Sequence, residues 1–283
     1  MANTERRDRS PKRPSSTDRR DMFRGRFHLL WDLVFRGLRA VGLRAGSFYT
    51  TVGIFLVAGV LIAIAGTLAF AKLGEVVRAG GTQQYDVAGL QWISQHHTPT
   101  LTRIMTELTF LGTGTVVLTI VGVAALFLWH TEHKHSARLL LASVAGGILL
   151  NNMLKLWFAR PRPEVFERMT QTASSSFPSG HAMSAMVCYG TVAYLVMRLQ
   201  KRHWSRVLTG TTAFILIVGI CTTRLYLGVH YPSDVIAGTV IGLAWAAFCM
   251  ATLEASLVLA RRRAPREVVE ERRAPTEARV SGA

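Results

Sequence analysis

The chain has 283 residues, of which 49% are hydrophobic and 18% are charged, and its mean hydropathy is +0.26. This composition is too apolar for an ordinary soluble domain and indicates an integral membrane protein. The formal net charge of +16 could suggest nucleic-acid binding, but the basic residues gather at the termini and in short loops, where membrane topology accounts for them.

Residues 1–47 form a basic N-terminal segment. Its first 21 residues are rich in Arg, Ser, Pro and Asp with little to bury, so we expect them to be disordered. Apolar residues then recur at spacings of three and four, at Phe27, Leu30, Val34, Leu38 and Val41. This pattern suits an amphipathic helix on the cytoplasmic leaflet. A cytosolic extension of the first membrane span explains it equally well.

Six stretches are long enough to cross a bilayer, which takes about 20 apolar residues per helix. They lie near 48–72, 108–129, 139–158, 182–198, 207–223 and 233–259. Gly238-x3-Gly242 in the last stretch predicts close helix packing. The sequence therefore predicts an all-α polytopic membrane domain over 48–259, followed by a polar cytoplasmic tail over 260–283.

The distribution of basic residues predicts the orientation of these spans. With six spans, the N-terminal segment, the loops 130–138 and 199–206 and the tail lie on one side, and all four are rich in Lys and Arg. Such regions face the cytoplasm, so both termini should be cytoplasmic and the membrane should be a bacterial inner membrane. The segment 73–107 then faces outward. Its aromatic residues alternate with polar ones such as Gln83 and Asp86, which suits an interfacial helix.

Three polar clusters stand out among the apolar segments: Lys155-x6-Arg162-Pro163, Pro178-Ser179-Gly180-His181 and Arg224-x5-His230-x3-Asp234. Polar groups at the ends of spans are costly to place there and indicate a site. The third and fifth spans run outward and the fourth and sixth run inward, so all three clusters should meet at the extracytoplasmic ends of the helices. A lone interfacial histidine or arginine is usually structural, but this shared depth favours one active site.

The first two clusters have the chemistry of a phosphate site. Prolines should end the helix between Lys155 and Arg162, which lets the arginine fold back beside the lysine. Arginine offers a planar fork of donors for phosphate oxygens, and lysine a point charge. Arg160 is a further cation nearby, for which an interfacial position is favoured over a catalytic one. Ser179 suits an N-cap, and Gly180 allows an anion close to the backbone.

The histidines suit phosphoryl transfer. His181 at a helix start is placed to protonate a leaving oxygen. Pro232 suits the first position of the last helix, which leaves His230 just outside it and Asp234 in its first turn. A carboxylate four residues on can hold one imidazole nitrogen and leave the other free to attack phosphorus.

The three motifs, as Lys155–Pro163, Pro178–His181 and Thr223–Asp234, resemble those of the type 2 phosphatidic acid phosphatase superfamily, and the resemblance extends over 48–259. Thr223 stands where serine is commoner, but it keeps a hydroxyl. The resemblance implies that His230 attacks phosphorus to form a phosphohistidine, that Asp234 orients it, and that His181 protonates the leaving group. It implies that the phosphoryl oxygens are bound by Lys155, Arg162, Ser179, Gly180 and Arg224. No metal and no other cofactor is implied.

The expected function is metal-independent hydrolysis of a lipid phosphate monoester or pyrophosphate at the outer face of the membrane. Undecaprenyl pyrophosphate and phosphatidate-type lipids, including phosphatidylglycerophosphate, are equally compatible with the motifs. The motif residues recognise the phosphate group and not the lipid tail. A lipid phosphotransferase with the same site is an alternative. A non-catalytic anion transporter is another, but it gives no reason for the spacing of His230 and Asp234. Membrane lipids are the expected partners, with no nucleic acid, and the oligomeric state is open.

Overall fold

A computed structural model describes residues 48–170 and 174–263, so the predictions for 1–47 and for the tail beyond residue 263 lie outside the described residues. The chain divides into two units, Met1–Ile54 and Phe55–Ala283. Within the first unit the described residues, from Phe48 on, are helical. The contacts discussed below belong to the second unit.

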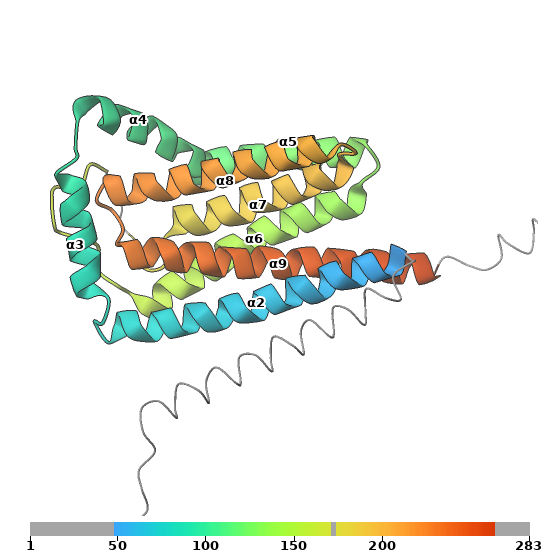
Figure 1. The fold of residues 1–283 in the computed structure, drawn as a ribbon, viewed down its shortest axis with the longest axis horizontal. Helices are drawn as coiled ribbons and strands as arrows, with labels where there is room; N and C mark the ends of the chain where they lie inside the picture. The colour runs from blue at the N-terminus through green and yellow to red at the C-terminus, as the bar shows by residue number, and fades with distance from the viewer. Residues whose placement is uncertain (1–47, 171–173, 264–283) are drawn as a thin grey trace, which may run out of the picture. The chain divides into compact units, whose positions relative to one another are not determined.

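All regular structure in the described residues is helical (Figure 1). The helices are α2 (Phe48–Arg78), α3 (Gln83–Ser94), α4 (Pro99–Thr109), α5 (Gly114–His130), α6 (Lys134–Phe158), α7 (Gly180–Leu199), α8 (His203–Tyr226) and α9 (Pro232–Arg263), with a short 3₁₀ turn at Phe110–Gly112. The prediction of an all-α membrane protein is confirmed.

Five of these helices are long and apolar enough to cross a membrane: Leu56–Arg78 of α2, α6, α7, α8 and Pro232–Ser256 of α9. A sixth span is possible if Pro99–Gly112 and Gly114–His130 are taken together, although they are bent by 49°. The bend falls at Thr113, whose backbone is extended between two glycines. The predicted second span at 108–129 therefore corresponds to α5 with the end of α4, and it is broken near its start.

α7 lies at the centre of the bundle and packs against α5, α6, α8 and α9 (Figure 1). In the most apolar stretch of α7, 50% of the residues are buried, whereas in that of α2 only 6% are buried. The large side chains that remain exposed are mostly aliphatic or aromatic, as on Leu126, Leu149 and Phe214. Such a surface suits contact with lipid.

Two glycines of α9 set its distance from α7. A Cβ atom at Gly238 would lie 2.5 Å from the carbonyl oxygen of Ser179, and one at Gly242 would lie 3.0 Å from that of Met183. Both distances are shorter than carbon–oxygen contacts in packed interiors, so only glycine fits without a shift. The predicted close packing at Gly238-x3-Gly242 is confirmed, and it fixes Ser179 directly against α9.

The bundle has one end at which α6 and α8 finish and α7 and α9 begin, which we call the site end. α3 packs there against α8 and α9, and its Asp86 lies at the start of α9. This short helix exposes Tyr85 and Trp92 and buries Asp86 and Leu90. The expected helix between the first two spans is therefore present, but Asp86, which we expected among its polar surface residues, points inward.

Candidate active site

The three polar clusters meet at the site end. The backbone N–H of Ser179 donates to the carbonyl oxygen of Asp234 at 3.0 Å, which joins the second cluster to the third. Nη1 of Arg162 donates to the carbonyl oxygen of Val229 at 2.6 Å and lies 3.4 Å from Nε2 of His230, which joins the first to the third. Four helix ends thus bring together residues that are far apart in the sequence.

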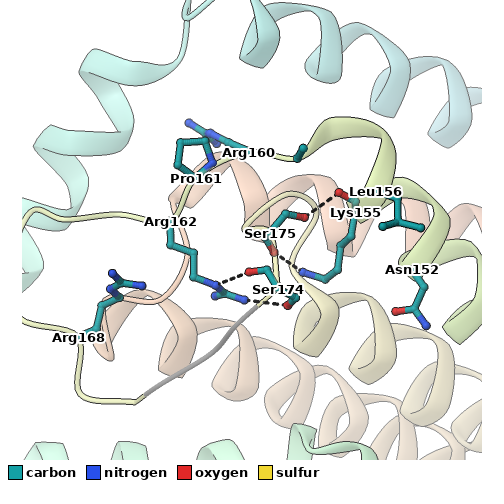
Figure 2. A pocket seen from close by; sticks show the side chains of 10 residues that line it. Asn152, Lys155, Leu156, Arg160, Pro161, Arg162, Arg168, Ser174 and Ser175 are labelled. Carbon is teal, nitrogen blue, oxygen red and sulfur yellow. Dashed lines mark hydrogen bonds between the residues drawn. The ribbon is translucent and has the colours of Figure 1, made fainter.

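The loop between α6 and α7 binds the side chains of the first two cations, Lys155 at the end of α6 and Arg162 in the loop itself (Figure 2). α6 ends at Phe158, and Ala159 takes a left-handed conformation with φ of 45°. Nζ of Lys155 donates to the carbonyl oxygen of Ser175 at 2.6 Å, and Nε of Arg162 donates to that of Ser174 at 2.8 Å. As predicted, the helix ends between the two cations, and the arginine turns back toward the lysine.

His230 and Asp234 form a buried pair. Nδ1 of His230 faces Oδ2 of Asp234 at 3.6 Å, longer than a hydrogen bond, and Oδ2 accepts the backbone N–H of Tyr231 at 2.9 Å. Burial lowers the pKa of His230 to about 4; Asp234 opposes this shift, and the charges of Arg162 and Arg224 add to it. The imidazole is therefore neutral near pH 7, with Nδ1 facing the carboxylate and Nε2 facing Arg162.

The start of α7 supplies the next group. Ser179 occupies the N-cap position, but its side chain makes no capping hydrogen bond, contrary to the capping role we expected, and its buried Oγ has no partner among the described residues. Gly180 begins the helix, and a Cβ there would lie 3.2 Å from Nδ2 of Asn151 and 3.6 Å from Cε of Lys155. A buried hydroxyl without a partner is costly, which fits a group that bonds to a ligand.

Arg224 on α8 and His181 on α7 are the remaining predicted site residues. Arg224 is buried; its Nη1 donates to Oγ1 of Thr109 at 2.7 Å, while its Nε has no partner among the described residues. Thr223 also donates to Thr109, at 3.1 Å, so the hydroxyl at this position has a structural use. His181 and Ile220, one turn before Arg224, both border Gly112. Thr109 was not singled out by the sequence, in which nothing distinguishes it from other threonines.

Arg160 has two partners that we did not expect. Its side chain is only 11% exposed, and its Nη1 donates to Oδ1 of Asp234 at 2.6 Å. Its Nη2 donates to Oδ2 of Asp86 at 2.8 Å. The interfacial depth favoured by the sequence stays a prediction, but the two carboxylate partners, which draw the guanidinium inward, were not predicted. A signal existed: Asp86 is the only acidic residue between Glu75 and Glu107.

A pocket of about 710 Å³ lies beside Lys155 and Arg162 (Figure 2). Its lining residues are Asn152, Lys155, Leu156, Ala159, Arg160, Pro161, Arg162, Arg168, Ser174 and Ser175. Four of these described residues are cations and none is acidic. One wall of the pocket is formed by α6, and there the pocket borders the exposed apolar surface of the bundle, where Leu156 is 83% exposed. The pocket thus connects the cations of the site with the apolar flank of the bundle.

This arrangement can hold a tetrahedral anion and bring a nucleophile to it. Lys155, Arg162 and Arg224 supply positive charge, and the imidazoles of His230 and His181 can attack and transfer a proton. Among residues 48–170 and 174–263 there is no group of three or more His, Cys, Asp or Glu side chains with the geometry of a metal site.

The chain is similar in sequence and in fold to known proteins. Residues 136–257 match the sequence profile of the PAP2 superfamily. Phosphatidylglycerophosphatase B of Bacillus subtilis is 30% identical over 62% of this chain and 87% of that protein. Undecaprenyl-diphosphatase of Sulfolobus acidocaldarius is 29% identical over 62% of this chain and 83% of that protein.

The fold is similar to the crystal structure of a transmembrane PAP2-type phosphatidylglycerolphosphate phosphatase from Bacillus subtilis. The two superpose with a TM-score of 0.63 at 26% identity, over 72% of this chain and 98% of the other. The sequence match covers most of the first relative's length, and the structural match covers nearly all of the solved chain. The protein therefore belongs to the PAP2 superfamily and is a membrane phosphatase.

Proposed function

We propose that this protein hydrolyses a lipid phosphate monoester or pyrophosphate through a phosphohistidine on His230, without a metal ion. The observation that carries the proposal is the orientation of this imidazole. One nitrogen faces Asp234 at 3.6 Å, and the other lies 3.4 Å from the Arg162 guanidinium, which is a natural partner for phosphoryl oxygens. A neutral imidazole held in this way is a nucleophile aimed at a bound phosphate.

In the first step Nε2 of His230 attacks phosphorus and the bond to the leaving oxygen breaks. His181, which enters the step protonated beside the bound anionic phosphate, donates this proton to that oxygen, and the Asp234 carboxylate stabilises the positive charge that develops on the His230 ring. In the second step His181 removes a proton from water, whose oxygen attacks phosphorus. The phosphorus–nitrogen bond then breaks and inorganic phosphate leaves.

Five residues would hold the phosphoryl oxygens: Lys155, Arg162, Ser179, Gly180 and Arg224. The unpartnered Ser179 Oγ and Arg224 Nε support this assignment, because both are buried donors with unused capacity. The three cations would carry the transition-state charge that metal ions neutralise in many other phosphoryl-transfer enzymes.

The pocket beside α6 supports a lipid as the substrate. It leads from Lys155 and Arg162 to the exposed apolar face at Leu156, so a headgroup could reach the cations while its chain stays in the bilayer. The relatives named phosphatidylglycerophosphatase B and undecaprenyl-diphosphatase support phosphatidate-type and isoprenoid lipids as the two substrate classes. We propose a substrate from one of these classes.

We further propose that the site end faces the outside of a bacterial inner membrane and that both termini are cytoplasmic. At the opposite end of the bundle, the loop 200–202 contains Lys201 and Arg202, and the loop 131–133 is followed by Lys134 and Arg138. Basic loops of this length favour the cytoplasmic side.

The test is phosphate release by purified protein in detergent with a chelator present, against a panel of lipid phosphates and pyrophosphates. The variant His230→Ala should lose at least about 1,000-fold in kcat/KM, because it lacks the imidazole on which the proposed covalent intermediate forms. His96→Ala, which changes an exposed histidine stacked on Trp92, should remain active. Activity that survives His230→Ala would refute the mechanism.

The phosphotransferase alternative is tested in the same assay. Addition of a short alcohol as a competing acceptor, with analysis of the phosphorylated products, separates transfer to water from transfer to the alcohol. A hydrolase should release inorganic phosphate as its main product, whereas a phosphotransferase would form mainly the phosphorylated alcohol.

A further inference from the structure

Arg160 bridges two buried carboxylates that belong to different parts of the chain. It lies 74 residues from each of them in the sequence, after Asp86 and before Asp234. Its Nη1 also donates to Oγ of Ser233 at 2.8 Å, and its guanidinium stacks on the ring of Tyr231 at 4.2 Å. Burial lowers the pKa of Arg160, but Asp234 and Asp86 raise it by more, so the guanidinium remains charged.

Asp86 anchors this bridge to the start of α9. Its Oδ1 accepts the backbone N–H of Ser233 at 2.9 Å, and its Oδ2 accepts the hydroxyl of the same residue at 2.6 Å. Free N–H groups in the first turn of a helix attract carboxylates. A side chain from α3 therefore satisfies the first turn of α9, the turn that also carries Asp234.

The bridge gives the two carboxylate oxygens of Asp234 different partners. Oδ1 is held by Arg160 at 2.6 Å, and Oδ2 is left to Tyr231 N–H and to Nδ1 of His230. With one oxygen fixed, the carboxylate cannot rotate away from the imidazole. The negative charge of Asp234 therefore stays beside the imidazole ring, where positive charge develops in the proposed attack.

We propose that Arg160 and Asp86 are positioning residues for the nucleophile: together they hold the Asp234 carboxylate in the orientation that aims His230 at phosphorus. Neither residue is among the five that we propose to hold the phosphoryl oxygens. The proposal rests on the proposed function, because it assumes that His230 is the nucleophile. It makes the short helix α3 a part of the catalytic apparatus.

The first test compares Arg160→Gln, Arg160→Lys and Asp86→Asn with wild type. Arg160→Gln should lower kcat by about 10- to 100-fold, the loss expected from a misplacement of roughly 1 Å, and change KM by less than about threefold. The kcat of Arg160→Lys should lie between those of wild type and Arg160→Gln, since one ammonium group cannot bridge both carboxylates. Arg78→Gln is the matched control, because Arg78 is an exposed arginine that donates to Trp157 O and stacks on Phe158.

Coupling of the two residues gives a further check. If Asp86 acts through Arg160, the double variant with Asp86→Asn and Arg160→Gln should lose no more kcat than Arg160→Gln alone. Asp86→Asn keeps the shape of the side chain, so it tests the bridge even if Arg160→Gln does not fold. Additive losses would show that the two residues act separately and would contradict the proposal.

A second readout separates positioning from a merely structural role. Vanadate binds to phosphatases as a five-coordinate mimic of the transition state and needs a correctly aimed nucleophile, whereas inorganic phosphate needs only the anion site. In Arg160→Gln the inhibition constant for vanadate should rise by about the factor lost in kcat, and that for phosphate should stay within about twofold. Equal weakening of both anions would overturn the proposal.

Failure of this inference is distinguishable from failure of the proposed function. If His230→Ala keeps its activity, the mechanism itself fails. If His230→Ala is inactive while Arg160→Gln and Asp86→Asn keep wild-type kcat, the mechanism stands and only the positioning role is refuted.

Discussion

The two ends of the bundle use their charged side chains differently. At the end opposite the site, Arg198 pairs with Glu254 at 2.8 Å, Glu254 also accepts the hydroxyl of Tyr194, and Lys134 pairs with Glu132 at 3.0 Å. At the site end, Lys155, Arg162 and Arg224 form no ion pair with any described carboxylate and instead donate to carbonyl or hydroxyl oxygens. Paired charges stabilise the fold, and cations without a carboxylate keep donor capacity for an anion.

The largest expected effect tests this contrast directly. Arg224→Gln removes a buried cation of the site end and should lower kcat/KM by about 100- to 1,000-fold, because the transition-state charge loses a partner in a water-poor site. The melting temperature should change little, since within the described part of the chain the Arg224 side chain hydrogen-bonds only to the hydroxyl of Thr109. Steady-state kinetics and thermal unfolding in detergent measure these two quantities. A large fall in melting temperature with an unchanged kcat/KM would show that Arg224 stabilises the fold and not the transition state.

The packing between the two cluster-bearing helices should give an intermediate effect. Gly238→Ala would bring a Cβ to 2.5 Å from Ser179 O, so α7 must shift and carry Ser179, Gly180 and His181 with it. We expect a cost of about 1–3 kcal/mol in unfolding free energy and about tenfold in kcat. Gly190→Ala on α7 is the control, because the nearest atom there, Sδ of Met186, is at an ordinary 3.6 Å.

The opposite end should respond in stability alone. Arg198→Gln leaves Glu254, whose side chain is 12% exposed, without its cation, and should cost about 1–3 kcal/mol. Chemical denaturation measures this loss. The kcat should stay within about twofold of wild type, and a larger fall would mean that the two ends are not independent.

The last expected change is the protonation of His230, which needs no mutation of the site. Its pKa of about 4 lies below the ordinary value of 6.5 because of burial, so the ring should stay neutral down to about pH 5. The native state then binds fewer protons than the unfolded state between these values. The contribution of His230 to stability is therefore complete above pH 6.5 and is lost as the pH falls toward 4.

NMR of histidine-labelled protein can follow this ring, with His230→Ala used to assign its signal. The unfolding free energy of wild type should also decline more steeply between pH 6.5 and 4 than that of His230→Ala. A titration near pH 6.5 would show that the ring is not desolvated as the fold implies.

Much of the fold and of the site could be predicted from the sequence, because charge inside an apolar chain has few places to lie. Lys155, Arg162 and His230 come together as the alternating direction of the spans requires. The break at Thr113 was not predicted, because a glycine such as Gly112 or Gly114 inside an apolar stretch can also be accommodated within a helix. Nor could the unused hydroxyl of Ser179, because an N-cap serine normally bonds to its own helix.

Arg160 and Asp86 escaped prediction for a different reason. Neither has a local pattern that reveals its partner, since each forms its ion pair across 74 residues, and only the tertiary fold brings α3 to the start of α9. Long-range pairs of this kind depend on how the loops are packed, which periodicity and composition do not encode.

The capping of α9 by Asp86 has a consequence for modular engineering. Residues 136–257, which match the PAP2 profile, contain the predicted catalytic and phosphate-binding residues, yet Asp86 and Thr109 lie outside them. A transplant of that segment into a foreign membrane scaffold would carry the reactive side chains without two of their supports. A chimera built at residue 135 should therefore recover its turnover only when the donated upstream half supplies a carboxylate and a hydroxyl at these two positions.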